Sequence, residues 1–177
     1  APGGTYLGVG PEQNFTYISA LRPKIAFIID IRRDMMIEHL MYKAVFEMSA
    51  DRAEFLSRLF SRPRPEGLGP KSSAEQLFEG FGAVDRSRQL YTENFEAILK
   101  SLEEKHGFTL SSEDEKSLEY VYNAFYVGGL DLNYNGPSSV GLGGRGRMPS
   151  YSELLVQTDR AGLNRSYLSS EETFRSR

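Results

Sequence analysis

The sequence contains no cysteine and only two histidines, His39 and His106. Without cysteine the chain can form no disulfide bond, no thiolate nucleophile and no cysteine-ligated metal site. The two histidines belong to no cluster with carboxylates at metal-ligand spacing, so we expect no metal site. His39 falls beside the apolar stripe of a predicted helix and His106 at a helix end, where a structural role is the simpler expectation.

Long apolar runs and a strong net charge are missing as well. No run reaches the roughly 18 residues that a membrane span needs. The first residues, APGGTY, lack the basic and apolar regions of a secretory signal. Together with the absence of cysteine, this favours a cytoplasmic protein. The formal net charge is −3 and no large basic block occurs, which disfavours binding to nucleic acid through its phosphates. The sequence indicates no oligomeric state.

The composition that is present is that of a globular domain. The chain has 177 residues, of which 40% are hydrophobic and 25% charged, enough for one domain with a core. Strand-forming residues at 5–9 run into two glycines and Pro11, and a helical pattern then continues to Pro23. A second apolar run follows at 25–31. Two such runs joined by a short helix predict a parallel βαβ unit whose strands are buried on both faces.

The remainder of the chain has the apolar period of helices. Helices are expected over 34–49 and 87–105, and after five pairs with capping-box spacing: Asp51 with Glu54, Ser73 with Gln76, Ser112 with Glu115, Ser150 with Glu153, and Ser169 with Glu172. The predicted organisation is a βαβα cofactor-binding half at 1–61, a linker at 62–72, a helical region at 73–127, a glycine-rich loop at 128–150 and a C-terminal helical segment at 151–177.

These elements predict a Rossmann-like α/β fold in which a parallel sheet carries a helix-rich insertion. Two parallel strands do not form a stable sheet alone. We therefore expect the chain to be a fragment of a longer α/β protein, with the missing strands after its C-terminal segment, or its sheet to be completed by strands that the patterns do not reveal.

A glycine turn and an aspartate about 20 residues later predict a ligand site. Gly8 and Gly10 would let the backbone bend tightly and let a ligand approach the amides at the start of the next helix. Asp30 would follow the second strand at the same edge of the sheet, where it can accept hydrogen bonds from a ribose. The alternative is that Asp30 caps a helix or pairs with Arg32 or Arg33.

The motif departs from the dinucleotide fingerprint G-x-G-x-x-G, because Gln13 stands in the place of the third glycine. Glu12 would repel a pyrophosphate at the helix start, which favours S-adenosylmethionine over NAD as the ligand. Arg32 could stack on adenine or pair with a 2′-phosphate. An NADP-linked oxidoreductase is therefore a further alternative.

Two stretches carry a family resemblance: YLGVGPEQNFTYISALRPKIAFIIDIRRDMMIEHLMYKAVFEMSADRAEFLSRLFSR and the tail GGRGRMPSYSELLVQTDRAGLNRSYLSSEETF. Together they resemble an uncharacterised bacterial family with a class I S-adenosylmethionine-dependent methyltransferase-like Rossmann domain. The similarity covers most of the chain. It implies that Gly8 and Gly10 form the cofactor loop and that Asp30 binds the ribose.

The resemblance is incomplete at the position two residues before the first of these glycines. Class I methyltransferases usually have an acidic residue there, whereas this chain has Tyr6. The amino-acid part of the cofactor would then need another partner, for which Glu12, Gln13 and Asn14 are the candidates.

Candidate substrate-binding residues lie in 131-DLNYNGPSS-139, namely Asp131, Asn133, Tyr134 and Asn135. This segment distantly resembles the Asn-Pro-Pro-Tyr loop with which some amino methyltransferases hold a target nitrogen. A turn stabilised by Asx hydrogen bonds is the plainer interpretation. The glycine-rich loop around it is expected to be a lid over the pocket.

The leading functional hypothesis is an S-adenosylmethionine-dependent methyltransferase, or a relative that binds this cofactor. The sequence identifies neither the methyl acceptor nor a catalytic base. Because the acid is missing at Tyr6 and no catalytic group is evident, the second hypothesis is a non-catalytic α/β module that works by protein–protein contact.

Overall fold

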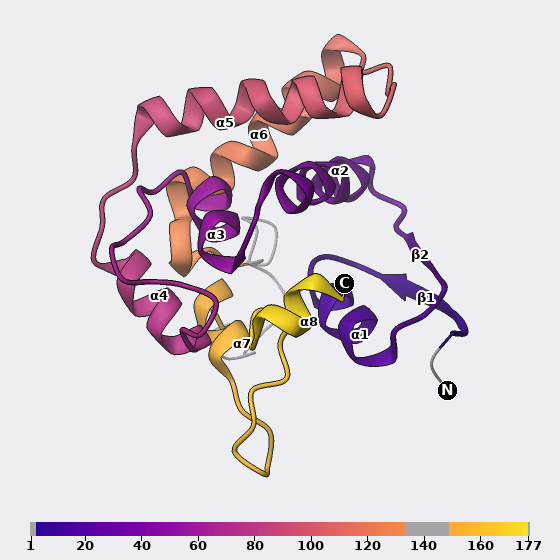
Figure 1. The fold of residues 1–177 in the computed structure, drawn as a ribbon. Helices are drawn as coiled ribbons and strands as arrows, with labels where there is room; N and C mark the ends of the chain where they lie inside the picture. The colour runs from indigo at the N-terminus through magenta and orange to yellow at the C-terminus, as the bar shows by residue number, and fades with distance from the viewer. Residues whose placement is uncertain (1–2, 134–148, 177) are drawn as a thin grey trace, which may run out of the picture.

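The structure, a computed structural model, describes residues 3–133 and 149–176. It is mostly helical, with two strands side by side at its margin (Figure 1). In chain order the elements are β1 (Thr5–Val9), α1 (Gln13–Leu21), β2 (Ile25–Ile29), α2 (Arg33–Met48), α3 (Arg52–Phe60), α4 (Ala74–Gly82), α5 (Arg88–Lys100), the π-helical turn η1 (Ser101–Lys105), α6 (Ser112–Gly128), the 3₁₀ turn η2 (Gly129–Asp131), α7 (Tyr151–Val156) and α8 (Glu171–Arg175).

The predicted Rossmann-like α/β fold is wrong. Within the described residues the sheet has two strands, β1 and β2, and the only other strand pairing is an isolated bridge between Thr158 and Asn164. The later apolar residues recur with the helical period and supply helices rather than further strands. The centre of this fold is therefore a group of packed helices, and the sheet lies beside it.

The predicted βαβ unit is confirmed. β1 and β2 are parallel, and Val9 lies opposite Ile29. Gly10 follows Val9 and Asp30 follows Ile29, so Gly10 and Asp30 lie beside each other at the carboxyl ends of the two strands. Helix α1 packs on one face of the sheet, where the rings of Tyr6 and Tyr17 are 6.5 Å apart.

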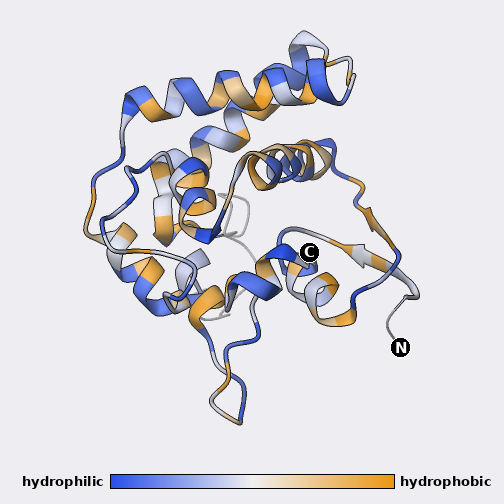
Figure 2. Cartoon of the chain, in the orientation of Figure 1, coloured by the Kyte–Doolittle hydropathy of each residue, from blue (hydrophilic) through white to orange (hydrophobic). Residues whose placement is uncertain are grey.

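The opposite face of the sheet is exposed, although both strands were expected to be buried. It consists of the five large apolar side chains of alternate strand positions, and all are more than half exposed: Leu7 67%, Val9 68%, Ile25 54%, Phe27 53% and Ile29 56%. We call these five residues the sheet face. Figure 2 shows β2 almost wholly in the hydrophobic colour at the margin of the molecule.

The core is aromatic and lies between the helices. Phe46 of α2 stacks on Phe55 of α3 with ring centroids 4.5 Å apart, and Tyr42 meets Phe125 of α6 edge to face at 5.7 Å. Phe15 of α1 packs on Phe46 at 4.9 Å. Burial of each such ring contributes about 2 kcal/mol. Phe15 therefore joins the βαβ unit to the helical core.

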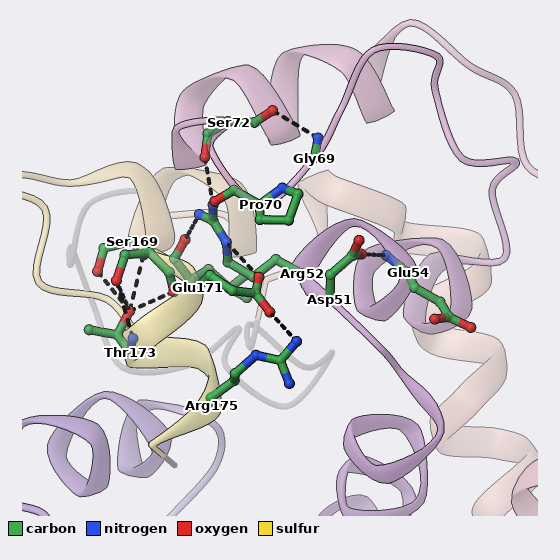
Figure 3. Close-up of polar contacts among 12 residues, drawn as sticks. Asp51, Arg52, Glu54, Gly69, Pro70, Ser72, Ser169, Glu171, Thr173 and Arg175 are labelled. Atoms are coloured by element: carbon green, nitrogen blue, oxygen red, sulfur yellow. Dashed lines mark hydrogen bonds and ion pairs between the residues drawn. The ribbon is translucent and has the colours of Figure 1, made fainter.

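Buried Arg52 connects three distant segments (Figure 3). Its side chain is 2% exposed and donates hydrogen bonds to the carbonyl oxygens of Leu168 at 2.7 Å, Pro70 at 3.0 Å and Ser72 at 2.6 Å. Its Nε lies 3.6 Å from a carboxylate oxygen of Glu171. The predicted linker at 62–72 is thus bound to the start of α3 and to the C-terminal segment.

Part of the predicted glycine-rich loop, 134–148, lies outside the described residues, and so do the candidates Tyr134 and Asn135. In the part of the chain that the structure describes, none of the helices combines the length and the hydrophobicity that a membrane crossing requires.

Candidate functional site

The glycine turn after β1 is held together by side chains of the protein itself. Gly10 has a φ of +89°, which favours glycine. The side-chain amide of Asn14 donates hydrogen bonds to the carbonyl oxygens of Gly10 at 2.9 Å and Pro11 at 2.8 Å. The hydroxyl of Tyr6 in turn donates to Asn14 Oδ1 at 2.7 Å. Two predicted site residues, Gly10 and Asn14, are thus joined by a hydrogen bond.

Gly8 provides room for this arrangement. A Cβ on residue 8 would overlap Asn14 Oδ1 and the ring of Tyr6. The absence of a side chain at Gly8 therefore makes space for Asn14 and Tyr6. The residue at the position where methyltransferases carry an acid, Tyr6, has a structural role in this turn.

Asp30 follows β2 beside the glycine turn, as predicted from the parallel strands. Its Oδ1 accepts hydrogen bonds from the backbone N–H of Arg32 at 2.9 Å and from the Arg32 guanidinium at 3.3 Å. These bonds hold the pKa of the Asp30 carboxyl below its usual range, so the group is ionised. The pairing with Arg32 is the alternative that the sequence left open. The backbone N–H of Ile31 makes a further, smaller contribution of the same sign to the pKa of Asp30.

His39 of α2 also contacts the glycine turn, a role that the sequence did not indicate. Its Nε2 lies 2.9 Å from the carbonyl oxygen of Gly10. A carbonyl only accepts, so Nε2 carries the proton. Burial lowers the pKa of His39, against the opposing effects of the Gly10 hydrogen bond and the charge of Asp30. His39 Nδ1 is buried and has no hydrogen-bond partner among the described residues.

Two neighbouring clefts lie between β2 and α2, and Phe15 and Ile18 of α1 also line the second of them. The first has a volume of about 460 Å³ and is lined by Ile28, Asp30, Met36 and His39, among others. The second has about 410 Å³ and is lined by residues that include Ala26 and Phe46. Lys43 lines both, so the two clefts are neighbours. We call them the Ile28 cleft and the Ala26 cleft.

A third cleft, of about 640 Å³, opens at the start of α1. Its lining includes the predicted residues Glu12 and Gln13, together with Tyr17, Leu154 and Arg165. Asp30 and Arg32 are not in its lining. Asp30 lines the Ile28 cleft instead, and the other predicted cofactor residues line neither of these two clefts: Gly8, Gly10, Asn14 and Arg32.

The predicted substrate residues that the structure describes lie elsewhere. Asp131 ends η2 and Asn133 follows it, and both are exposed. Neither lines the three clefts. Among the described residues no group of three or more His, Asp or Glu side chains could hold a metal ion.

Comparison with known proteins identifies a family. A family model described as a domain of unknown function (DUF7790) matches residues 1–124. No curated protein and no solved structure gave a match. The matched residues make up more than half of the chain and include both strands, the glycine turn and the helices from α1 to α5. The chain therefore belongs to the DUF7790 family.

Proposed function

We propose that this chain works by binding another polypeptide across the sheet face. The observation that supports the proposal is the exposure of all five of its side chains, Leu7, Val9, Ile25, Phe27 and Ile29. Parallel strands occur almost only where both faces of the sheet are covered. Here α1 packs on one face, against β1, and a partner would cover the other.

The size of the sheet face favours a binding role. Five large side chains that are half exposed or more leave on the order of 500 Å² of apolar surface in water, about as much as the largest patches on ordinary monomers, which are often functional. Removing that area from water would contribute on the order of 10 kcal/mol to association. The translational and rotational entropy that the two partners lose on association offsets much of this gain.

Site-specific photo-crosslinking in cells that produce the protein tests the proposal. The crosslinker p-benzoylphenylalanine replaces Phe27 in one variant and Tyr120, an aromatic residue that is 72% exposed on α6, in the control. We expect a discrete protein adduct from position 27 and none from position 120. The captured protein is then purified, and its Kd is measured with the wild-type chain and with Phe27→Lys. At least tenfold weaker binding supports the proposal, and an unchanged Kd contradicts it.

A second candidate function is the binding of S-adenosylmethionine at the ends of β1 and β2. It is favoured by one observation, the adjacency of Gly10 and an ionised Asp30 beside the Ile28 cleft. In this candidate function, the Asp30 carboxylate would accept a hydrogen bond from a ribose. One observation disfavours a ligand over Gly8, because the side chains of Tyr6 and Asn14 already occupy the space beside this residue.

Titration calorimetry with S-adenosylmethionine, S-adenosylhomocysteine, NAD and NADP decides this second candidate. Binding of the first two that is lost in Asp30→Ala would support a methyltransferase-type site. A preference for NADP that is lost in Arg32→Ala would favour the oxidoreductase alternative. If none of the four compounds gives heat, the cofactor hypothesis is rejected.

A further inference from the structure

The outer edge of β2 is open. Within residues 3–133 and 149–176, β2 pairs with β1 alone. No side chain or loop among these residues hydrogen-bonds to the backbone N–H and C=O groups of β2 that point away from β1. Such an edge presents a row of unpaired N–H and C=O groups that can bind another strand. At the end of β1, the side-chain amides of Gln13 and Asn14 donate to the carbonyl oxygen of Val9.

The Ala26 cleft and the Ile28 cleft lie one after the other along this edge. Ala26 and Ile28 are two residues apart and so belong to one face of β2, the face opposite the sheet face. Alternate side chains of a strand repeat about every 7 Å on one face. A strand added beside β2 would therefore present side chains i and i+2 to two successive clefts.

We propose that the partner adds an extended segment to the open edge of β2 as a third strand, with two alternate apolar side chains in the Ala26 and Ile28 clefts. This inference rests on the proposed function, because the side chains of the added strand that point the other way would extend the sheet face. Main-chain hydrogen bonds would provide affinity, and the clefts would select the side chains.

The charges around the edge favour a partner strand with acidic residues at its ends. Exposed Lys24 precedes β2 and forms no ion pair with a described residue. Arg32 follows β2 with 64% of its side chain exposed, and it contacts Asp30 through its Nε atom. Lys43 lines both clefts but is paired with Glu47, which also lines the Ala26 cleft. Lys24 and Arg32 are therefore the charges that an acidic partner strand would meet. Acidic ends would fix the register of the added strand and speed its association.

A second copy of the chain fits this edge less well. Antiparallel pairing of two β2 strands would place Lys24 opposite Asp30 of the other copy, but the two-fold axis of such a pair is perpendicular to the sheet. It would bring both α2 helices to the same side of the sheet, where α2 already flanks the two clefts. A separate extended segment brings no such helix.

The test uses a fluorescent, capped peptide with aspartate at both ends and alternating valine and threonine between them. We expect saturable binding by fluorescence anisotropy. Ala26→Arg, which fills the Ala26 cleft, should weaken binding at least tenfold, whereas the control Tyr120→Ser on distant α6 should leave the Kd unchanged. A peptide N-methylated at the amides that face β2 should not bind, because it cannot pair with the edge.

The possible failures of the two proposals are distinguishable. If the peptide, and three others with leucine, phenylalanine or tyrosine in place of valine, do not bind, or if they bind Ala26→Arg equally well, strand addition is overturned. An adduct from position 27 would still support the proposed function. A dimer of the chain alone in sedimentation velocity that Ala26→Arg dissociates would also overturn the inference, and would identify the occupant as a second copy.

Discussion

The side-chain oxygen of Asn14 occupies the space that a Cβ on Gly8 would need. The same oxygen accepts a hydrogen bond from Tyr6, and the amide of Asn14 donates to the turn at Gly10. The glycine turn is thus closed from inside by residues of its own βαβ unit. This packing explains why residue 8 is a glycine, and the explanation requires no ligand.

Replacing Gly8 by alanine should destabilise the chain by about 2 kcal/mol, because Asn14 and Tyr6 would have to move and their hydrogen bond would be strained. Gly69→Ala is the matched control, since nothing lies within 4 Å of a Cβ there. Urea unfolding followed by circular dichroism measures both variants. Equal stability of Gly8→Ala and the wild type would show that the turn is not packed as described.

Arg52→Met should lower the free energy of unfolding by about 3 kcal/mol or more. It removes three hydrogen bonds to carbonyl oxygens and leaves Glu171 near a neutral side chain. Arg64→Met, which breaks a more exposed pair with Asp51, should cost about 1 kcal/mol at most. Guanidinium unfolding compares the two. If Arg52→Met lowered the free energy of unfolding no more than Arg64→Met does, a central role of Arg52 would be contradicted.

Glu47 should make stability depend on pH in the acidic range. Hydrogen bonds from Lys105 first, and then from Lys43 and His106, lower the pKa of Glu47 from 4.5 to about 2. A carboxylate whose pKa is depressed by folding stabilises the folded state above its unfolded pKa. That contribution is lost as the pH falls from about 4.5 to about 2.

The variant Glu47→Gln measures this contribution. At neutral pH it should be less stable than the wild type by about 1 kcal/mol, since solvent screens these groups. Most of the difference should be lost near pH 2, because about half of the Glu47 carboxyls are then protonated in the folded wild type and nearly all of them in the unfolded chain. Thermal unfolding from pH 2 to 7 provides the curves. If the stability difference between the wild type and Glu47→Gln stayed constant from pH 2 to 7, folding would not lower the pKa of Glu47.

Local sequence signals predicted the helices well. The pairs Ser73 with Gln76 and Ser150 with Glu153 form capping boxes as expected, because the partners are three residues apart and need no tertiary contact. The box expected at Ser112 is formed one residue earlier by Ser111 and Asp114. The sequence SSEDE allows both registers. The described one places Asp114 beside Arg33, 81 residues away in sequence.

Tertiary features were less predictable. The patterns identified β1 and β2 and their parallel order, but not that Phe27 and its neighbours on the sheet face are exposed, since burial depends on what packs on a strand. The network of Arg52 joins residues more than 100 positions apart, and nothing local indicates it. Asp30 was ambiguous in sequence, and the hydrogen bonds from Arg32 give it a local partner.

The absence of cysteine allows the most direct test of the central claim. Phe27→Cys introduces a unique thiol on the sheet face, and its rate of reaction with a maleimide reports whether that face is open. We predict rapid reaction in the purified chain, and at least tenfold slower reaction when the protein captured by crosslinking is present at saturation, whereas Tyr120→Cys reacts equally fast in both. Equal rates for Phe27→Cys with and without the partner would contradict the claim that the partner covers the sheet face.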